Sequence, residues 1–334
     1  MLRRKRFWFG LIISLSFLGV FLARTDFEEI RRSFGEANYW LAFAAVPLYF
    51  VGFWLRTIRW HLLLKPVINV SVRRLYPIVL IGLMANNVAP ARVGELVRAY
   101  LVGERESISK STALGTIAGD WAFDGLTLVA LLGIVAAISG ATAGVKLIGV
   151  LTALLFAAMT VVLVVLAFSP RARHVVSRLI TLLPRGLALR IEGMLDAFLS
   201  GLIAVRSPLT LAMAMALSFI SWLVEGFMYW VVGQAFGLDV GFDAYLLILA
   251  AANLALSILA SPGGVGPFEA ASQQVLHSFA VAQGLAGAYT LALHALLLGP
   301  VIIVGFVLLW STQVSLSQIL GVPRQPSAVP ARTE

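Results

Sequence analysis

Arginine and carboxylate side chains recur inside stretches of this chain that are otherwise apolar, and they are the residues that could do chemistry. Arg92, Glu95 and Arg98 are spaced i, i+3 and i+6, so they share one side of a helix if the chain is helical from Gly94 onward. A guanidinium group offers forked N–H donors that suit phosphate. The spacing therefore predicts a site for an anionic group. Alternatively, Glu95 pairs with one arginine and holds the local structure.

Further ionisable residues lie in segments that are apolar enough to enter a membrane. Asp120 and Asp124 are four residues apart and share a helix face. Glu225 has no basic residue nearby in the sequence, so we expect it to be protonated or paired across helices. A charge at membrane depth is costly and marks a partner or a path. We expect the two aspartates to pair with the arginines, to carry a proton or to lie near the interface. His294 could relay protons, but a buried, hydrogen-bonded neutral imidazole is the simpler expectation.

Proline and glycine interrupt two apolar segments in the same way, once in each half of the chain. Residues 86–95 read NNVAPARVGE and residues 261–269 read SPGGVGPFE, so both contain Pro-x-x-Val-Gly followed by glutamate, which is Glu269 in the second break. Unwound backbone at membrane depth must line a protein-buried or water-filled site, and paired breaks indicate the binding site of a transporter. The amide of Asn87 can bond freed backbone groups or a headgroup. The residues that break the two segments are Pro90, Gly94, Pro262, Gly263, Gly264 and Gly266. We expect Gly263 or Gly264 to adopt a positive φ, which residues with a Cβ resist.

The composition is that of a polytopic membrane protein. The 334 residues are 60% hydrophobic and 12% charged, with a mean hydropathy of +0.93, whereas a soluble domain is about 45–50% apolar and about 25% charged. The absence of cysteine excludes disulfides. The four histidines show no metal-ligand spacing, so we expect no metal and no cofactor. The net charge of +9 fits arginines in cytoplasmic loops facing anionic lipid, and we expect no nucleic-acid binding.

The hydrophobic segments predict an all-α polytopic fold with about six full spans and two re-entrant broken-helix hairpins. A spanning helix needs about 20 mostly apolar residues. The predicted spans are residues 7–23, 39–55, 113–138, 145–168, 209–236 and 287–310. We name the broken segments hairpin one, about residues 75–102, and hairpin two, about residues 244–283. The arginine-rich residues 169–207 are expected to form one or two interfacial helices on the cytoplasmic surface, or a plain soluble connector. Residues 1–312 would form the membrane domain and residues 313–334 a disordered cytoplasmic tail.

The distribution of basic residues predicts the orientation. If both hairpins return to the side that they entered, few of the 25 lysines and arginines fall outside; these are Arg24, Arg31, Arg32 and Lys146. The positive-inside rule then places both termini in the cytoplasm, for a protein of the plasma (inner) membrane. Hairpin one would enter from the cytoplasm and hairpin two from outside, so the two halves would form inverted repeats.

Three sequence elements carry a resemblance to a known family: RTIRW at residues 56–60, APARVGELVR at residues 89–98 and SPGGVGPFEA at residues 261–270. They resemble the membrane region of the lysylphosphatidylglycerol synthase/flippase family, over about residues 7–312. Members often show Glu-Arg-x-x-Asp in the span after hairpin one, where this chain has Trp121 in place of the arginine. Two-domain members carry a soluble aminoacyl-transfer domain, which we do not expect here because only a short tail follows the last span. The resemblance implies movement of a phospholipid or polyprenyl-phosphate lipid between leaflets.

These observations predict a lipid flippase or transporter for an anionic phospholipid or polyprenyl-phosphate-linked lipid, not an enzyme. The residues expected to bind the lipid are Asn87, Arg92, Glu95, Arg98, Asp120, Asp124, Glu225 and Glu269. One alternative is a membrane glycosyl or phosphoryl transferase that uses Asp120 and Asp124. Another is a non-catalytic membrane partner of a lipid- or hopanoid-synthesis enzyme. The sequence leaves the lipid, the energy source and the oligomeric state open.

Overall fold

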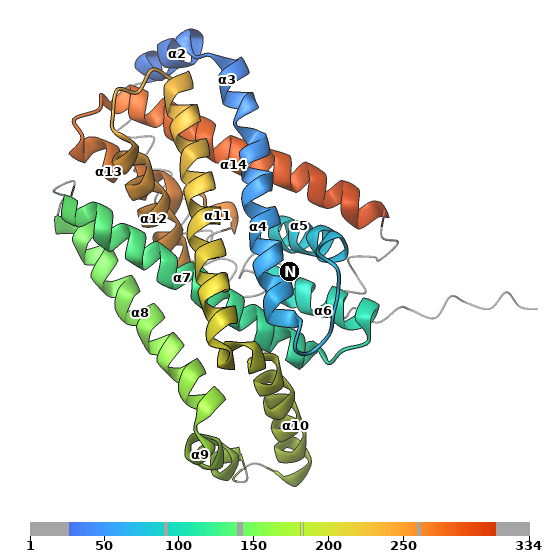
Figure 1. Ribbon diagram of the computed structural model, residues 1–334. Coiled ribbons are helices and arrows are strands. Elements are labelled where there is room, and N and C mark those ends of the chain that lie inside the picture. Colours follow the sequence, from blue (N-terminus) through green and yellow to red (C-terminus); the bar gives the residue numbers. More distant parts are fainter. Residues whose placement is uncertain are drawn as a thin grey trace, which may run out of the picture.

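Helices account for all the regular structure that the computed structural model describes, which covers residues 27–89, 93–138, 143–180, 182, 184–258 and 262–311 (Figure 1). The α-helices are α2 (Phe27–Glu36), α3 (Tyr39–Ala44), α4 (Val46–Leu64), α5 (Val72–Val88), α6 (Gly94–Glu106), α7 (Lys110–Ile138), α8 (Ala143–Phe168), α9 (Pro170–Ile180), α10 (Arg185–Gly201), α11 (Pro208–Ala235), α12 (Phe242–Ile258), α13 (Pro267–Ser278) and α14 (Gln283–Ser311). Two short 3-10 helices are η1 (Ile203–Arg206) and η2 (Pro262–Gly264). The predicted all-α polytopic fold is confirmed. The predicted span at residues 7–23 and the tail at residues 313–334 lie outside the described residues.

Four described helical stretches are long and apolar enough to cross a membrane, or five if a bent pair counts as one span. The four are Tyr39–Leu64, Lys110–Ile138, Pro208–Ala235 and Gln283–Ser311, and the bent pair joins Ala153–Leu166 to Pro170–Ile180 at 92°. The second predicted span was too short, because helix α4 continues past residue 55 to Leu64. Arg56 and Arg59, which the sequence placed in a cytoplasmic loop, therefore lie inside a spanning helix and are buried.

The two hairpins pack against the opposite halves of the chain. In hairpin one, α5 and α6 pack on each other, and α5 also packs along α14 near the end of the chain. In hairpin two, α12 and α13 pack on each other, and α12 also packs along α7 of the first half. The long helices α4 and α11 run side by side between them (Figure 1). Each hairpin is thus held by a spanning helix that lies far away in the sequence.

Glycines permit the close approach of the two arms of hairpin one. A Cβ on Gly94 would lie 2.0 Å from the carbonyl oxygen of Gly82, so no larger residue fits there without a shift of backbone. The side chain of Asn86 accepts a hydrogen bond of 2.7 Å from the N–H of Gly94 and so bonds a backbone group freed by the break. The break of hairpin one is therefore closed by its own side chains.

Hairpin two turns through residues in the left-handed region. Gly263, Gly264 and Gly266 have φ of 61°, 75° and 98°, which confirms the expected positive φ. Pro267 then begins α13, and the carboxylate of Glu269 accepts a hydrogen bond of 2.7 Å from the N–H of Gly266. A proline at the first helical position and an acidic side chain at the third are both typical of a helix N-terminus.

Different short helices lie at the two ends of the molecule. Helix α2 lies at one end, where Glu29 accepts a hydrogen bond of 2.8 Å from the N–H of Gly284 at the start of α14 (Figure 1). Helices α9 and α10, which occupy most of residues 169–207, lie at the other end. Gly115 and Gly201 let α7 and α10 meet closely, since a Cβ on either would lie about 2 Å from backbone of the other helix.

Gly94→Ala tests the close packing of hairpin one. The added Cβ would overlap the backbone of α5, so we expect a loss of about 1–3 kcal/mol in the free energy of unfolding. The midpoint of thermal unfolding in detergent measures it. Gly133→Ala is the matched control, because a Cβ at that exposed helical position meets nothing within 4 Å. Equal midpoints for the two variants would contradict the packing.

Candidate functional site

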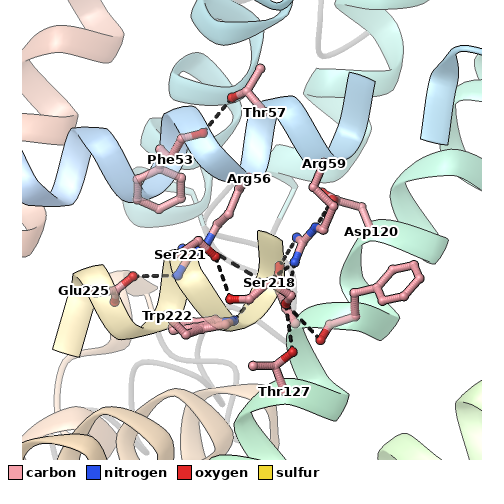
Figure 2. A network of polar contacts seen from close by, with 12 residues as sticks. Phe53, Arg56, Thr57, Arg59, Asp120, Thr127, Ser218, Ser221, Trp222 and Glu225 are labelled. Carbon is pink, nitrogen blue, oxygen red and sulfur yellow. Dashed lines mark hydrogen bonds and ion pairs between the residues drawn. The ribbon is translucent and has the colours of Figure 1, made fainter. Parts of the chain in front are cut away.

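The side chain of Arg59 is fully buried and joins α4 to α7 and α11 (Figure 2). Its Nε donates to Asp120 Oδ1 at 2.8 Å, and its Nη1 and Nη2 donate to the two carboxylate oxygens of Asp124 at 2.8 Å each. Nη1 also donates to the hydroxyl of Ser218 at 2.8 Å. The forked guanidinium therefore holds both aspartates of α7, which share a face as their spacing predicted.

Arg56 lies one helical turn earlier on α4 and turns toward α11 (Figure 2). Its Nη2 donates to Glu225 Oε2 at 2.6 Å, so Glu225 is paired across helices, one of the two expected outcomes. The guanidinium carbon of Arg56 stands 3.8 Å from the ring centroid of Trp222, a cation–π contact. Trp222 in turn donates from Nε1 to Asp124 Oδ1 at 2.9 Å and so links the two ion pairs.

Arg98 of hairpin one reaches the same cluster from α6. Its Nη2 donates to Asp120 Oδ2 at 3.1 Å, and its guanidinium carbon lies 4.2 Å from the ring centroid of Trp60. Asp120 is therefore shared between Arg59 and Arg98, so the aspartate does pair with a hairpin arginine. Glu95 does not bond Arg98. Its Oε1 accepts from Asn86 Nδ2 at 3.1 Å instead.

A cavity of about 210 Å³, lined by both charged and apolar side chains, lies between these groups and the two hairpins. Its lining includes the predicted Asn87, Glu95, Arg98, Asp120, Asp124, Glu225, Gly263 and Gly264, together with Arg56 and His294. A single water needs only about 10–15 Å³ on this scale, so the space suits a group larger than a few waters. Elements far apart in the sequence thus share one chamber.

Two guanidinium N–H groups at this chamber have no hydrogen-bond partner among the described residues. They are the Nε groups of Arg56 and Arg98, and both atoms are buried. A buried donor without a partner is costly, and such a group is a candidate for bonding a ligand. One other donor of each side chain, Nη2, bonds a carboxylate, which is Glu225 for Arg56 and Asp120 for Arg98. Arg56 Nε also lies 4.0 Å from Asp124 Oδ1, and neither Nε is exposed to the open space of the chamber, so an acceptor would reach either group only after the side chain moves.

The structure separates some of the predicted site residues from the chamber. Glu269 lies behind His294, whose ring stacks on Phe268 at 4.4 Å, and its carboxylate bonds His294 and the backbone of hairpin two instead of lining the chamber. Gly94 and Gly266 shape the two breaks. Arg92 and Pro90, and the side chain of Pro262, lie outside what the structure describes.

Arg56 and Arg59 were not among the predicted site residues. The sequence did carry a signal for them, because apolar residues continue after Arg59 through Leu62, Leu63 and Leu64, which is typical of one long helix. A second signal was that Asp120, Asp124 and Glu225 have no arginine within their own apolar segments and so need partners from elsewhere. Trp121 lines the chamber, and Asp120 and Asp124 form ion pairs with Arg59 of α4.

Long apolar helices that enclose a buried charge network define a polytopic α-helical membrane protein with an internal polar site. The chain belongs to the family described as the lysylphosphatidylglycerol synthase transmembrane region, whose sequence model matches residues 7–305. It is 27% identical over 262 residues to a UPF0104 membrane protein of Methanothermobacter thermautotrophicus, and the alignment covers 71% of this chain and 75% of that protein. It is 28% identical over 302 residues to the glycosyltransferase AglD of Haloferax volcanii, and this alignment covers 80% of this chain but only 48% of that protein. No solved structure gave a significant match.

Arg59→Met tests whether the buried arginine holds the cluster together. The substitution leaves the carboxylates of Asp120 and Asp124 with less compensation, so we expect a loss of about 3–5 kcal/mol in the free energy of unfolding. Thermal unfolding in detergent measures it. Adding Asp120→Asn and Asp124→Asn should restore part of the stability, because the unpaired charges are then gone.

The control for this series is Arg74→Met, whose side chain is exposed and lies 3.9 Å from Glu106. An exposed pair contributes little, so this variant should unfold close to wild type. If Arg59→Met behaves like Arg74→Met, the cluster does not hold α4, α7 and α11 together.

Proposed function

We propose that this protein moves a lipid with a phosphate-bearing headgroup between the leaflets of a membrane. The observation that carries the proposal is the chamber itself, a cavity between two broken helices whose lining includes the side chains of Arg56 and Arg98. Phosphate oxygens are strong acceptors for guanidinium donors. The headgroup would occupy the chamber while the acyl or polyprenyl chains stay in the bilayer.

The charges of the described site are close to balance. The described cluster holds three guanidinium groups, from Arg56, Arg59 and Arg98, against the carboxylates of Glu95, Asp120, Asp124 and Glu225. Near-balance lets the site exist inside a membrane without a ligand. Binding would then come from directed hydrogen bonds, not from a large positive field.

The packing also supports an inverted repeat, in which one unit is α4, hairpin one and α7, and the other is α11, hairpin two and α14. The contact of α5 with α14 corresponds to that of α12 with α7, and α4 meets its counterpart α11. Inverted repeats with broken helices at the binding site are a common design for alternating access. Rocking of one unit against the other would open the chamber to each side in turn.

The name of the AglD relative raises a transferase as the second candidate, with Asp120 and Asp124 as its acids. In the structure both aspartates accept hydrogen bonds from Arg59, which favours a structural role over acid–base chemistry. Transfer of a sugar or phosphoryl group by the purified protein, lost in Asp124→Asn, would support the enzyme instead.

Arg98→Ala tests the headgroup site. We expect it to slow the movement of fluorescent phosphatidylglycerol in reconstituted vesicles by at least about tenfold, the cost of a lost hydrogen bond to a charged group. Arg98→Lys should recover only part of the rate, because a point charge replaces a fork. Arg105→Ala is the matched control, since Arg105 is exposed in the last turn of the same helix. Equal rates for Arg98→Ala and Arg105→Ala would remove Arg98 from the mechanism.

Cysteine labelling tests the proposed orientation in a chain without native cysteine. Single cysteines at exposed Ser107 and Gly186 should react from the cytoplasmic side of the plasma (inner) membrane, and one at Gly35 in α2 only from the outside. The reason is that arginines collect near the first two positions, whereas Gly35 follows Arg31 and Arg32, which the predicted orientation places outside. Labelling of Ser107→Cys and Gly35→Cys from the same side would contradict the re-entrant arrangement of hairpin one.

A further inference from the structure

A buried histidine and glutamate join the last spanning helix to hairpin two. His294 Nδ1 lies 2.5 Å from Glu269 Oε1, and His294 Nε2 lies 2.9 Å from the carbonyl oxygen of Gly263. Glu269 and His294 are only 3% and 6% exposed. The three groups come from α13, α14 and the break of hairpin two, so one side chain connects three parts of the site.

The partners of His294 fix the number of protons in this arrangement. The carbonyl of Gly263 can only accept, so Nε2 must carry a hydrogen. An ionised Glu269 can also only accept, so Nδ1 must carry a hydrogen as well; a bare Nδ1 would require the hydrogen on Glu269. In both cases the Glu269–His294 pair carries one more proton than the state with a neutral imidazole and an ionised carboxylate.

The position of Glu269 favours placing that proton on the histidine. Its other oxygen accepts from the N–H of Gly266 at the N-terminus of α13, where the helix dipole stabilises a negative charge. The pair is then an imidazolium bonded to a carboxylate. Loss of the proton would leave two lone pairs facing each other, and the ring would have to release either Glu269 or Gly263.

The carbonyl of Gly263 lies where the two hairpins meet. Gly263 has a φ of 61°, and a Cβ on it would lie 3.3 Å from the carbonyl oxygen of Asn87 in hairpin one. Release of this carbonyl would free the break of hairpin two beside the chamber. A proton on His294 thus holds the contact between the hairpins in the arrangement seen here.

Other ionisable groups face the same chamber and would respond to a proton nearby. They are Arg56 of α4, Glu95 and Arg98 of α6, Asp120 and Asp124 of α7, and Glu225 of α11. Tyr49 and Tyr229 also line it, and α5 contributes the amides of Asn86 and Asn87. At the start of α14, α2 presents Glu29 to the backbone of Gly284, and on α13 the remaining ionisable side chain is the exposed His277. Arg56 and Arg98 form ion pairs with Glu225 and Asp120, whereas Glu269 is bonded by His294 and by no arginine among the described residues.

We propose that Glu269 and His294 form a proton-binding site that couples lipid movement to a proton gradient. The coupling rests on the proposed lipid transport, whereas the proton site stands without it. Binding adds one proton to the imidazole and closes the contacts to Glu269 and Gly263. Release returns the proton to water on the side to which the chamber is then open and frees hairpin two to move.

Nitrogen NMR of the whole protein, labelled with ¹⁵N-histidine in detergent, tests the proton site directly. The His294 signal is assigned by its loss in His294→Gln. At neutral pH we expect both ring nitrogens of His294 to be protonated. In Glu269→Gln the side-chain amide can donate to Nδ1, so His294 should become neutral at the same pH while the contacts persist. A neutral His294 in the wild-type protein would overturn the proposal.

His277→Gln is the matched control, because His277 is an exposed histidine on the same helix as Glu269. In this variant the His294 signals should still show that both ring nitrogens are protonated. Loss of double protonation in His277→Gln as well would show that the signal reports general loosening of the fold and would overturn the assignment to the pair.

Vesicles containing fluorescent phosphatidylglycerol test the coupling. An imposed pH gradient should change the rate of lipid movement by wild type and by His277→Gln, and this response should be lost in Glu269→Gln and His294→Gln. Wild-type movement that ignores the gradient would overturn the coupling. Absence of any movement would count against the proposed function instead, and the NMR result would still decide the proton site.

Discussion

The contact of Arg59 with Asp120 and Asp124 is the interaction on which the rest of the structure depends. A guanidinium group in a spanning helix cannot face lipid, since a charge at the bilayer centre costs about 2.5–3.5 kcal/mol or more. The fork of Arg59 is satisfied only when α4, α7 and α11 pack in one register. The apolar surfaces of these helices allow many registers, whereas the charge network allows few. Pairing of buried polar groups thus sets the arrangement that encloses the chamber.

Each of the two helix breaks frees a backbone N–H group, and a different side chain accepts its hydrogen bond in each hairpin. In hairpin one the side chain of Asn86 bonds the freed N–H of Gly94, and in hairpin two the carboxylate of Glu269 bonds the N–H of Gly266. Both bonds satisfy a backbone N–H that the break frees. Hairpin one then presents Arg98 to the chamber, and hairpin two presents a carbonyl bonded by His294. This division fits a transporter in which one hairpin contacts the headgroup and the other responds to a proton.

Local patterns in the sequence predicted much of this site. The spacing of Asp120 and Asp124 placed them on one face, the lack of a nearby base predicted that Glu225 is protonated or paired across helices, and the paired breaks indicated a binding site. The partners themselves could not be predicted. The second predicted span ended before Arg56 and Arg59, because an unpaired charge normally ends an apolar helix. These arginines can lie inside the helix only because carboxylates 61 to 169 residues away in the sequence pair with them. Likewise, the orientation of Glu269 depends on His294, 25 residues away on another helix.

The lipid that stays bound through purification tests the central claim, that the chamber holds a phosphate-bearing headgroup. Native mass spectrometry of the protein released from its detergent micelle identifies that lipid, and Arg98→Ala can be compared with the exposed control Arg105→Ala. We predict a phosphate-bearing lipid on the wild-type protein and on Arg105→Ala, and its loss from Arg98→Ala. A wild-type protein that carries no such lipid, or one retained equally by Arg98→Ala, would contradict the account.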